Sequence, residues 1–218
     1  MRRIPHSPAL LIAAANAFVG IGGDASIARR RGQSALASEF LRGVGIETDP
    51  MTDGSDHVAW HTAFVHHIGY WSHYDQETDE SSWPLPASPS AEQLGAFAND
   101  HGLLSSEPEP GDLFLLWGPA KRAFVRSGIV VSVEGSGFTW KGKACHHCAV
   151  IEGNTNEGRS ATGGLTLRHL RRLSAAHGDT FVRWYEIDER KPRASAATPM
   201  ENGAIASATS DGELRRAA

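Results

Sequence analysis

Residues 56–67 read DHVAWHTAFVHH, and the interpretation of the rest of the chain depends on this stretch. Asp56 is a residue type that caps helix starts, because its carboxylate can accept a hydrogen bond from a backbone N–H of the first turn. Apolar residues follow it at helical spacing as far as Trp71. The stretch therefore predicts a helix from Asp56 to about Tyr74 with one buried side.

The remaining elements change from helices to strands along the chain. Apolar spacing predicts helices over 8–19 and 33–44, and Ser90 predicts the cap of a further helix over 90–101. Strand-like runs follow, bounded by glycine and charged residues: 111–117, 123–133, 137–141, 147–154 and 180–187. TLRHLRRLSAAH (166–177) is interpreted as a short basic helix or turn. Helices followed by an antiparallel meander predict an α+β domain.

Composition restricts the class of protein. The chain has 218 residues, 40% of them hydrophobic, which is typical of a soluble globular protein. The net charge of −4 gives no electrostatic footprint for nucleic acid. No stretch approaches 18 consecutive apolar residues, so no membrane span is expected.

The two ends of the chain need separate interpretations. MRRIPHSPALLIAAANA (1–17) superficially matches a secretion signal, but its apolar run is short and interrupted, so we interpret it as the first helix. Alanine, serine, threonine and glycine dominate the C-terminal end, which cannot bury much apolar surface. We expect one domain over 1–188 and a low-complexity tail over 189–218, through which neighbouring chains of an assembly could bind.

Four stretches carry a resemblance to a known family. They are FVGIGG with GQSALASEFLRGVGI (18–23 and 32–46), AWHTAFV (59–65), EPGDLFLLW with RSGIVVSVEG (109–117 and 126–135) and VIEGNTNEG (150–158). In this order they resemble the CHAP-domain peptidoglycan hydrolases, which are cysteine amidases and endopeptidases of the papain-like NlpC superfamily. The resemblance covers roughly 8–187. It implies a papain-like CHAP fold, in which N-terminal helices pack on an antiparallel β-sheet.

The resemblance also implies positions for the catalytic groups. In that family a cysteine thiolate at a helix start attacks an amide carbonyl, a histidine on a neighbouring strand is the base, and an acid or amide orients the histidine. In this chain the nucleophile position is His61 and the base position is Arg126. The orienting position is Glu152, with Asn154 close by.

Two of these positions no longer carry the family's chemistry. Arginine has no acceptor lone pair and stays protonated, so Arg126 cannot act as a base. An acyl-imidazole pathway through His61 would therefore lack a partner base. Ser127 follows Arg126 on a strand and is expected to point away from the cleft. Thr62 lies about 100° round the helix axis from His61, so neither hydroxyl is expected to substitute.

We therefore expect a filled-in cleft. Arg126 and Glu152 should form an ion pair, and a neighbouring guanidinium should bias His61 towards its neutral form. The predicted function is a catalytically degenerate domain that contacts cell-wall peptidoglycan or serves as a structural component, for example of a phage or phage-derived particle. No cofactor is expected. The sequence does not determine a location: without a convincing signal peptide, it is compatible with the bacterial cytoplasm before release and with a phage particle.

Two alternatives stay open. The first is an active peptidoglycan amidase or endopeptidase that uses an atypical site around Glu152. The second is a zinc site, because His57 and His61 are four residues apart and would share one side of a helix. Cys145 and Cys148 are interpreted as reduced thiols at an irregular strand start, with a disulfide or a metal as further alternatives.

Overall fold

The computed structural model of the chain describes residues 6–20, 35–47, 60–155 and 165–187. The chain divides into two units, 1–187 and 188–218, and every described residue belongs to the first. The predicted cap Asp56 and the predicted tail lie outside the described residues. Within the described ranges, no helix is long and apolar enough to cross a membrane.

The helices occur where the sequence predicts them. They are α1 (Pro8–Ala17), α3 (Ala35–Arg42), α4 (His61–Ser72) and α5 (Ala91–Asp100). Two of them start at capping serines: the Ser7 hydroxyl accepts a hydrogen bond from the backbone N–H of Leu10, and the Ser90 hydroxyl accepts one from that of Gln93, each at 3.3 Å. Helix α4 is shorter than predicted, because it begins at His61 with Trp60 at the N-cap position.

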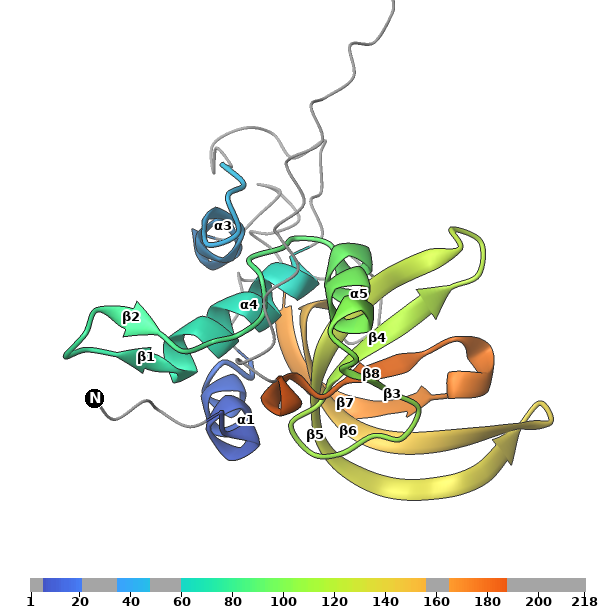
Figure 1. The fold of residues 1–218 in the computed structure, drawn as a ribbon. Helices are drawn as coiled ribbons and strands as arrows, with labels where there is room; N and C mark the ends of the chain where they lie inside the picture. Colours follow the sequence, from blue (N-terminus) through green and yellow to red (C-terminus); the bar gives the residue numbers. More distant parts are fainter. Residues whose placement is uncertain (1–5, 21–34, 48–59, 156–164, 188–218) are drawn as a thin grey trace, which may run out of the picture. The chain divides into compact units, whose positions relative to one another are not determined.

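The strands form a hairpin and a larger sheet (Figure 1). The hairpin pairs β1 (Tyr74–Asp75) with β2 (Glu80–Ser81). The six-stranded sheet has the order β3-β8-β4-β5-β6-β7, and its pairs are antiparallel. Its strands are β3 (Leu104–Ser105), β4 (Leu113–Gly118), β5 (Ala123–Trp140), β6 (Lys143–Thr155), β7 (Leu165–Leu173) and β8 (Thr180–Val182). The α+β class and the meander from β4 to β7 are confirmed.

Four predicted elements need correction. The segment 166–177 is mainly strand β7, because its inward positions alternate with exposed ones at Arg168, Leu170 and Arg172, which is the period of a strand. The separate strands predicted over 123–133 and 137–141 are one continuous strand, β5. The strand predicted over 180–187 ends at Val182, and a short 3₁₀-helix occupies Trp184–Glu186.

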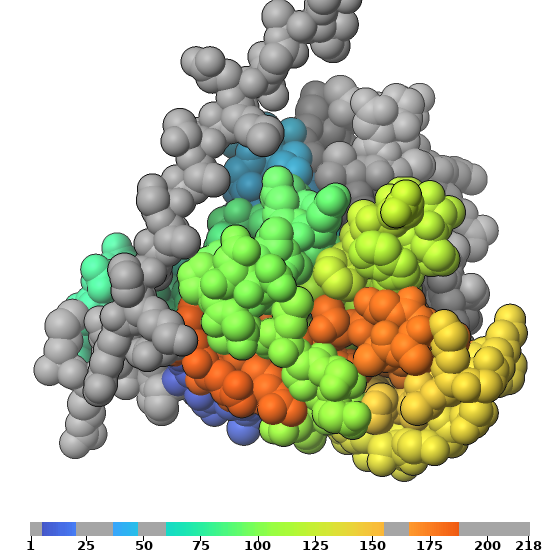
Figure 2. Space-filling view, turned by 45° about the vertical axis from the view of Figure 1, so that its right-hand side comes forward, coloured from blue at the N-terminus to red at the C-terminus, as the bar shows by residue number. Residues whose placement is uncertain are grey.

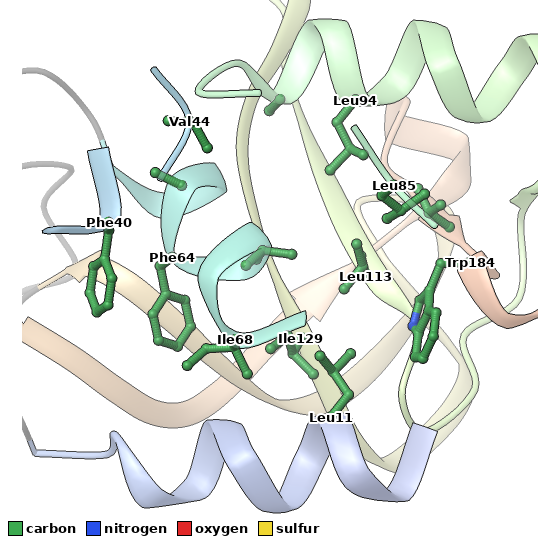
Figure 3. Close-up of a cluster of buried hydrophobic side chains, with 14 of the residues drawn as sticks. Leu11, Phe40, Val44, Phe64, Ile68, Leu85, Leu94, Leu113, Ile129 and Trp184 are labelled. Carbon is green, nitrogen blue, oxygen red and sulfur yellow. The ribbon is translucent and has the colours of Figure 1, made fainter. Parts of the chain in front are cut away.

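The sheet has a hydrophobic core on each face. The larger core joins the sheet to helices α1, α3, α4 and α5, and Figure 3 shows side chains from all of these elements converging between them. Its labelled members are Leu11, Phe40, Val44, Phe64, Ile68, Leu85, Leu94, Leu113, Ile129 and Trp184. The smaller core lies on the other face and consists of Phe114, Val130, Cys148, Val150, Leu173 and Phe181. Burial of apolar surface on both faces fixes which side each strand residue must face.

A glycine on β6 lets helix α4 approach the sheet closely. A Cβ atom at Gly153 would lie 2.5 Å from the Trp60 ring and 2.8 Å from the Cβ of Phe64. Since no real side chain tolerates such distances, glycine is required for this packing. The contact places the first turn of α4 against β5 and β6, so the side chain of His61 meets the sheet.

Candidate functional site

His61 is the first residue of α4 and is buried, with 6% of its surface exposed. Its Nδ1 lies 3.0 Å from the Thr62 hydroxyl, and the ring also hydrogen-bonds to the backbone of Val125. Burial, followed by the positive charge of Arg126, lowers the pKa of His61 from 6.5 to about 4. This direction agrees with the expected bias of His61 towards its neutral form. A neutral ring that donates to a backbone carbonyl accepts at Nδ1, so the Thr62 hydroxyl donates to it.

The position of Ser127 corrects the prediction that it points away from His61. Its hydroxyl lies 3.0 Å from the hydroxyl of Thr62 and 3.5 Å from Nδ1 of His61. The reason is that Ser127 shares its side of β5 with Ile129, which belongs to the core beneath the helices. Thr62, which was not expected to be well placed, joins the other two side chains. We call His61, Thr62 and Ser127 the neutral cluster.

Arg126 points to the opposite side of β5, where the smaller core lies. Its Nη1 donates to Oε2 of Glu152 at 2.8 Å, so the predicted ion pair is confirmed. Glu152 is fully buried and Arg126 is 5% exposed. Asn154 contributes its backbone carbonyl, which lies 3.5 Å from Nη2 of Arg126.

Two residues that were not predicted complete the site around Glu152. Arg171 donates from Nε to Oε1 and from Nη2 to Oε2, the second at 2.8 Å. His169 places Nε2 2.9 Å from Oε1, and it must be the donor because a carboxylate in ion pairs only accepts. We call Arg126, Glu152, His169 and Arg171 the ionic cluster.

The hydrogen-bonding and charged partners of Glu152 affect its pKa more strongly than its burial does. Burial alone would raise the pKa of Glu152, but the hydrogen bond from His169, the charge and hydrogen bonds of Arg171 and the hydrogen bond from Arg126 lower it from 4.5 to about 2. Gly128 leaves room for this arrangement. A Cβ atom there would lie 2.5 Å from the Phe114 ring and 2.9 Å from Cγ of Glu152.

The spacing of residues in the sequence indicates that His169 and Arg171 lie on the same side of a strand. Leu167, His169, Arg171 and Leu173 are spaced two residues apart, which is the period of one side of a strand. In the predicted helix or turn, these four positions would not lie on one side. In the observed register, Arg171 pairs with Cys148 and His169 with Val150, so both lie beside the strand that carries Glu152.

The cysteines are free buried thiols, as predicted. Burial, followed by the nearby charge of Asp112, raises the pKa of Cys148 to about 11, which opposes formation of a reactive thiolate. Among the described residues, no group of three or more His, Cys, Asp or Glu is placed to hold a metal ion. His57 of the proposed zinc pair lies outside the described residues.

The arrangement restricts what the site can do chemically. Thr62 and His61 have the hydrogen bond that a nucleophile and a base would need, but Thr62 is 2% exposed and Ser127 is fully buried. A carbonyl carbon must approach the attacking oxygen directly, and packed protein occupies that space. Glu152, which would orient a base in the family, accepts its hydrogen bonds from Arg126, His169 and Arg171 instead. The carboxylate of Glu152 and the hydroxyls of the neutral cluster therefore have their hydrogen-bond partners within the protein, whereas Nδ1 of His169 is buried with no hydrogen-bond partner among the described residues.

Comparisons with protein-family models, with curated proteins and with solved structures found no match to this chain.

Proposed function

We propose that this chain is a catalytically inactive CHAP-like domain that contacts cell-wall peptidoglycan or serves as a structural component of a phage or phage-derived particle. The observation that carries the proposal is the state of the nucleophile position. His61 is buried, neutral and hydrogen-bonded on both sides, and Arg126 at the base position is held by Glu152. No group at these positions can be both exposed to substrate and deprotonated by a neighbour.

A turbidity assay tests the catalytic part of the proposal. Purified cell walls are incubated with the wild-type protein, with Glu152→Ala and with His61→Asn, after each variant has been checked for folding by circular dichroism. We expect no clearing by any of the three proteins. Clearing by the wild type that disappears in either folded variant would establish an atypical active site and would overturn the proposal.

A co-sedimentation assay separates the two roles within the proposal. Insoluble peptidoglycan is pelleted with the wild-type protein, with serum albumin as the unrelated control. Selective recovery in the pellet supports contact with the cell wall. Recovery equal to that of albumin rejects cell-wall contact and leaves the role of a structural component.

A further inference from the structure

One exposed face of β5, β6 and β7 combines aromatic rings with positive charge. The ring of His147 on β6 packs at a tilt against that of Phe138 on β5, with ring centres 4.0 Å apart. The guanidinium of Arg172 on β7 lies 3.6 Å from the centre of the Trp140 ring, and the Lys141 ammonium lies 5.9 Å from it. We call these five residues the basic surface. Figure 2 shows the hairpin of β5 and β6, in yellow, at the surface of the molecule.

The basic surface is apolar as well as charged, and it is open. Trp140 is 41% exposed, and Leu170, two residues before Arg172 on β7, is 53% exposed. Apart from Arg171, which belongs to the ionic cluster, the segments 131–147 and 165–173 contain four lysines and arginines, all exposed, and a single acidic residue, Glu134. The chain as a whole has a net charge of −4, so this surface differs from the rest in the sign of its charge. Such a local concentration of positive charge and exposed apolar area indicates an interaction surface.

A second group of exposed aromatic residues lies next to acidic side chains. Trp71, at the end of α4, is 55% exposed, and its ring centre lies 5.0 Å from that of Tyr74 and 5.4 Å from that of Tyr70. The hairpin of β1 and β2 follows directly, and residues 70–82 contain no lysine or arginine. We call this region the acidic surface; its members are Tyr70, Trp71, Tyr74, Asp75, Glu77, Asp79 and Glu80.

We propose that the basic surface of one chain binds the acidic surface of a second copy. The two surfaces are complementary in charge, and each presents an exposed indole, which buries apolar area when it is covered. Trp71 and Trp140 are both exposed in the single chain, so neither surface is covered by the other within one copy. A second copy supplies the complement to each of them.

The contact is heterologous, because two different surfaces meet. Each copy that binds a neighbour through its basic surface keeps its acidic surface available, so the contact builds open chains unless the rotation between copies closes a ring. The attraction between exposed charges is screened by salt. This inference does not depend on the absence of catalysis, and its failure would leave the proposed function unchanged.

Analytical ultracentrifugation of the full chain tests the inference. We expect association over a concentration series up to about 1 mM, and a roughly tenfold weakening when salt rises from about 0.05 M to about 0.5 M. Arg172→Glu and Glu77→Lys should each weaken association about tenfold or more, because each places like charges opposite each other. A mixture of the two variants should associate again, because the first keeps the native acidic surface and the second keeps the native basic surface.

Two exposed charges outside both surfaces provide matched controls. Lys121→Glu and Asp100→Lys change the net charge by the same amounts and should leave association unchanged. A wild-type protein that stays monomeric throughout the series would overturn the inference. So would association that is insensitive to both charge reversals, or a mixture of the two variants that fails to associate.

Discussion

Strand β5 carries two buried polar clusters, one on each side, that begin at consecutive residues. Ser127 faces the helices and belongs to the neutral cluster, in which three uncharged side chains share hydrogen bonds. Arg126 faces the other way and belongs to the ionic cluster, in which one carboxylate accepts from two guanidinium groups and an imidazole. Successive residues of a strand point to opposite sides of the sheet. Because of this alternation, the hydroxyl and imidazole of Thr62 and His61, which resemble a nucleophile and a base, lie on one side of the sheet. Glu152, the acid predicted to orient a base, lies on the other.

The two clusters should also differ in what they contribute to stability. Removal of one partner from a buried ion pair leaves an uncompensated charge, whereas removal of one hydroxyl leaves a smaller unsatisfied group. Substitutions on the two sides of β5 can therefore test the comparison, and we expect the largest effect on the ionic side.

Glu152→Gln should lower the free energy of unfolding by about 3–5 kcal/mol, because Arg126 and Arg171 would lose the buried carboxylate that both of them pair with. The midpoint of urea unfolding measures the change. Glu134→Gln is the matched control, since it removes an exposed carboxylate from the same sheet and should cost less than about 0.5 kcal/mol. Equal losses in the two variants would show that the ionic cluster contributes no more than a surface charge.

His61 should make stability depend on pH in a specific window. As pH falls, the unfolded chain binds a proton at His61 near pH 6.5, whereas the folded chain resists protonation until about pH 4. The contribution of His61 is therefore fully present above pH 6.5 and is lost between 6.5 and about 4, on the order of 3 kcal/mol. His61→Asn should flatten this part of the stability profile. The wild type should lose further stability between pH 4.5 and about 2, a window that overlaps the acid end of the first, as Glu152 is protonated.

A second histidine also contributes to the pH dependence of the free energy of unfolding above pH 4.5. Burial also lowers the pKa of His66 on the same helix to about 4, so His66→Asn should remove a similar part of the slope. The double variant should be flatter than either single variant. A profile that keeps the wild-type slope in the double variant would contradict the assignment.

Ser127→Ala should have the smallest effect, a loss of about 1–2 kcal/mol. Thr62 keeps its hydrogen bond to His61 in this variant and loses only the one to Ser127. Chemical denaturation of Ser127→Ala beside Ser132→Ala, a less buried serine on the same strand, gives the comparison. A loss as large as that of Glu152→Gln would show that the neutral cluster is not the weaker of the two.

Much of this architecture could be predicted from the sequence. The periodicity of the apolar residues predicts the helices, and the resemblance predicts the pairing of Arg126 with Glu152. The sequence does not show which of Arg126 and Ser127 faces the helices. Both residues are polar, and both are buried, so polarity does not distinguish the two sides of β5 at this point. The partners His169 and Arg171 were missed because LRHLRRL suits a basic helix as well as a strand, and only pairing with β6 decides between them.

The pKa of His61 in the folded protein tests the central claim most directly. Titration of the ring protons by NMR, assigned by comparison with His61→Asn, should give a midpoint at about 4, because burial and Arg126 oppose the charged form. This result would show a closed, neutral group at residue 61. A midpoint at 6.5 or above would mean a solvated imidazole able to take part in chemistry, and it would contradict the account of a filled-in site.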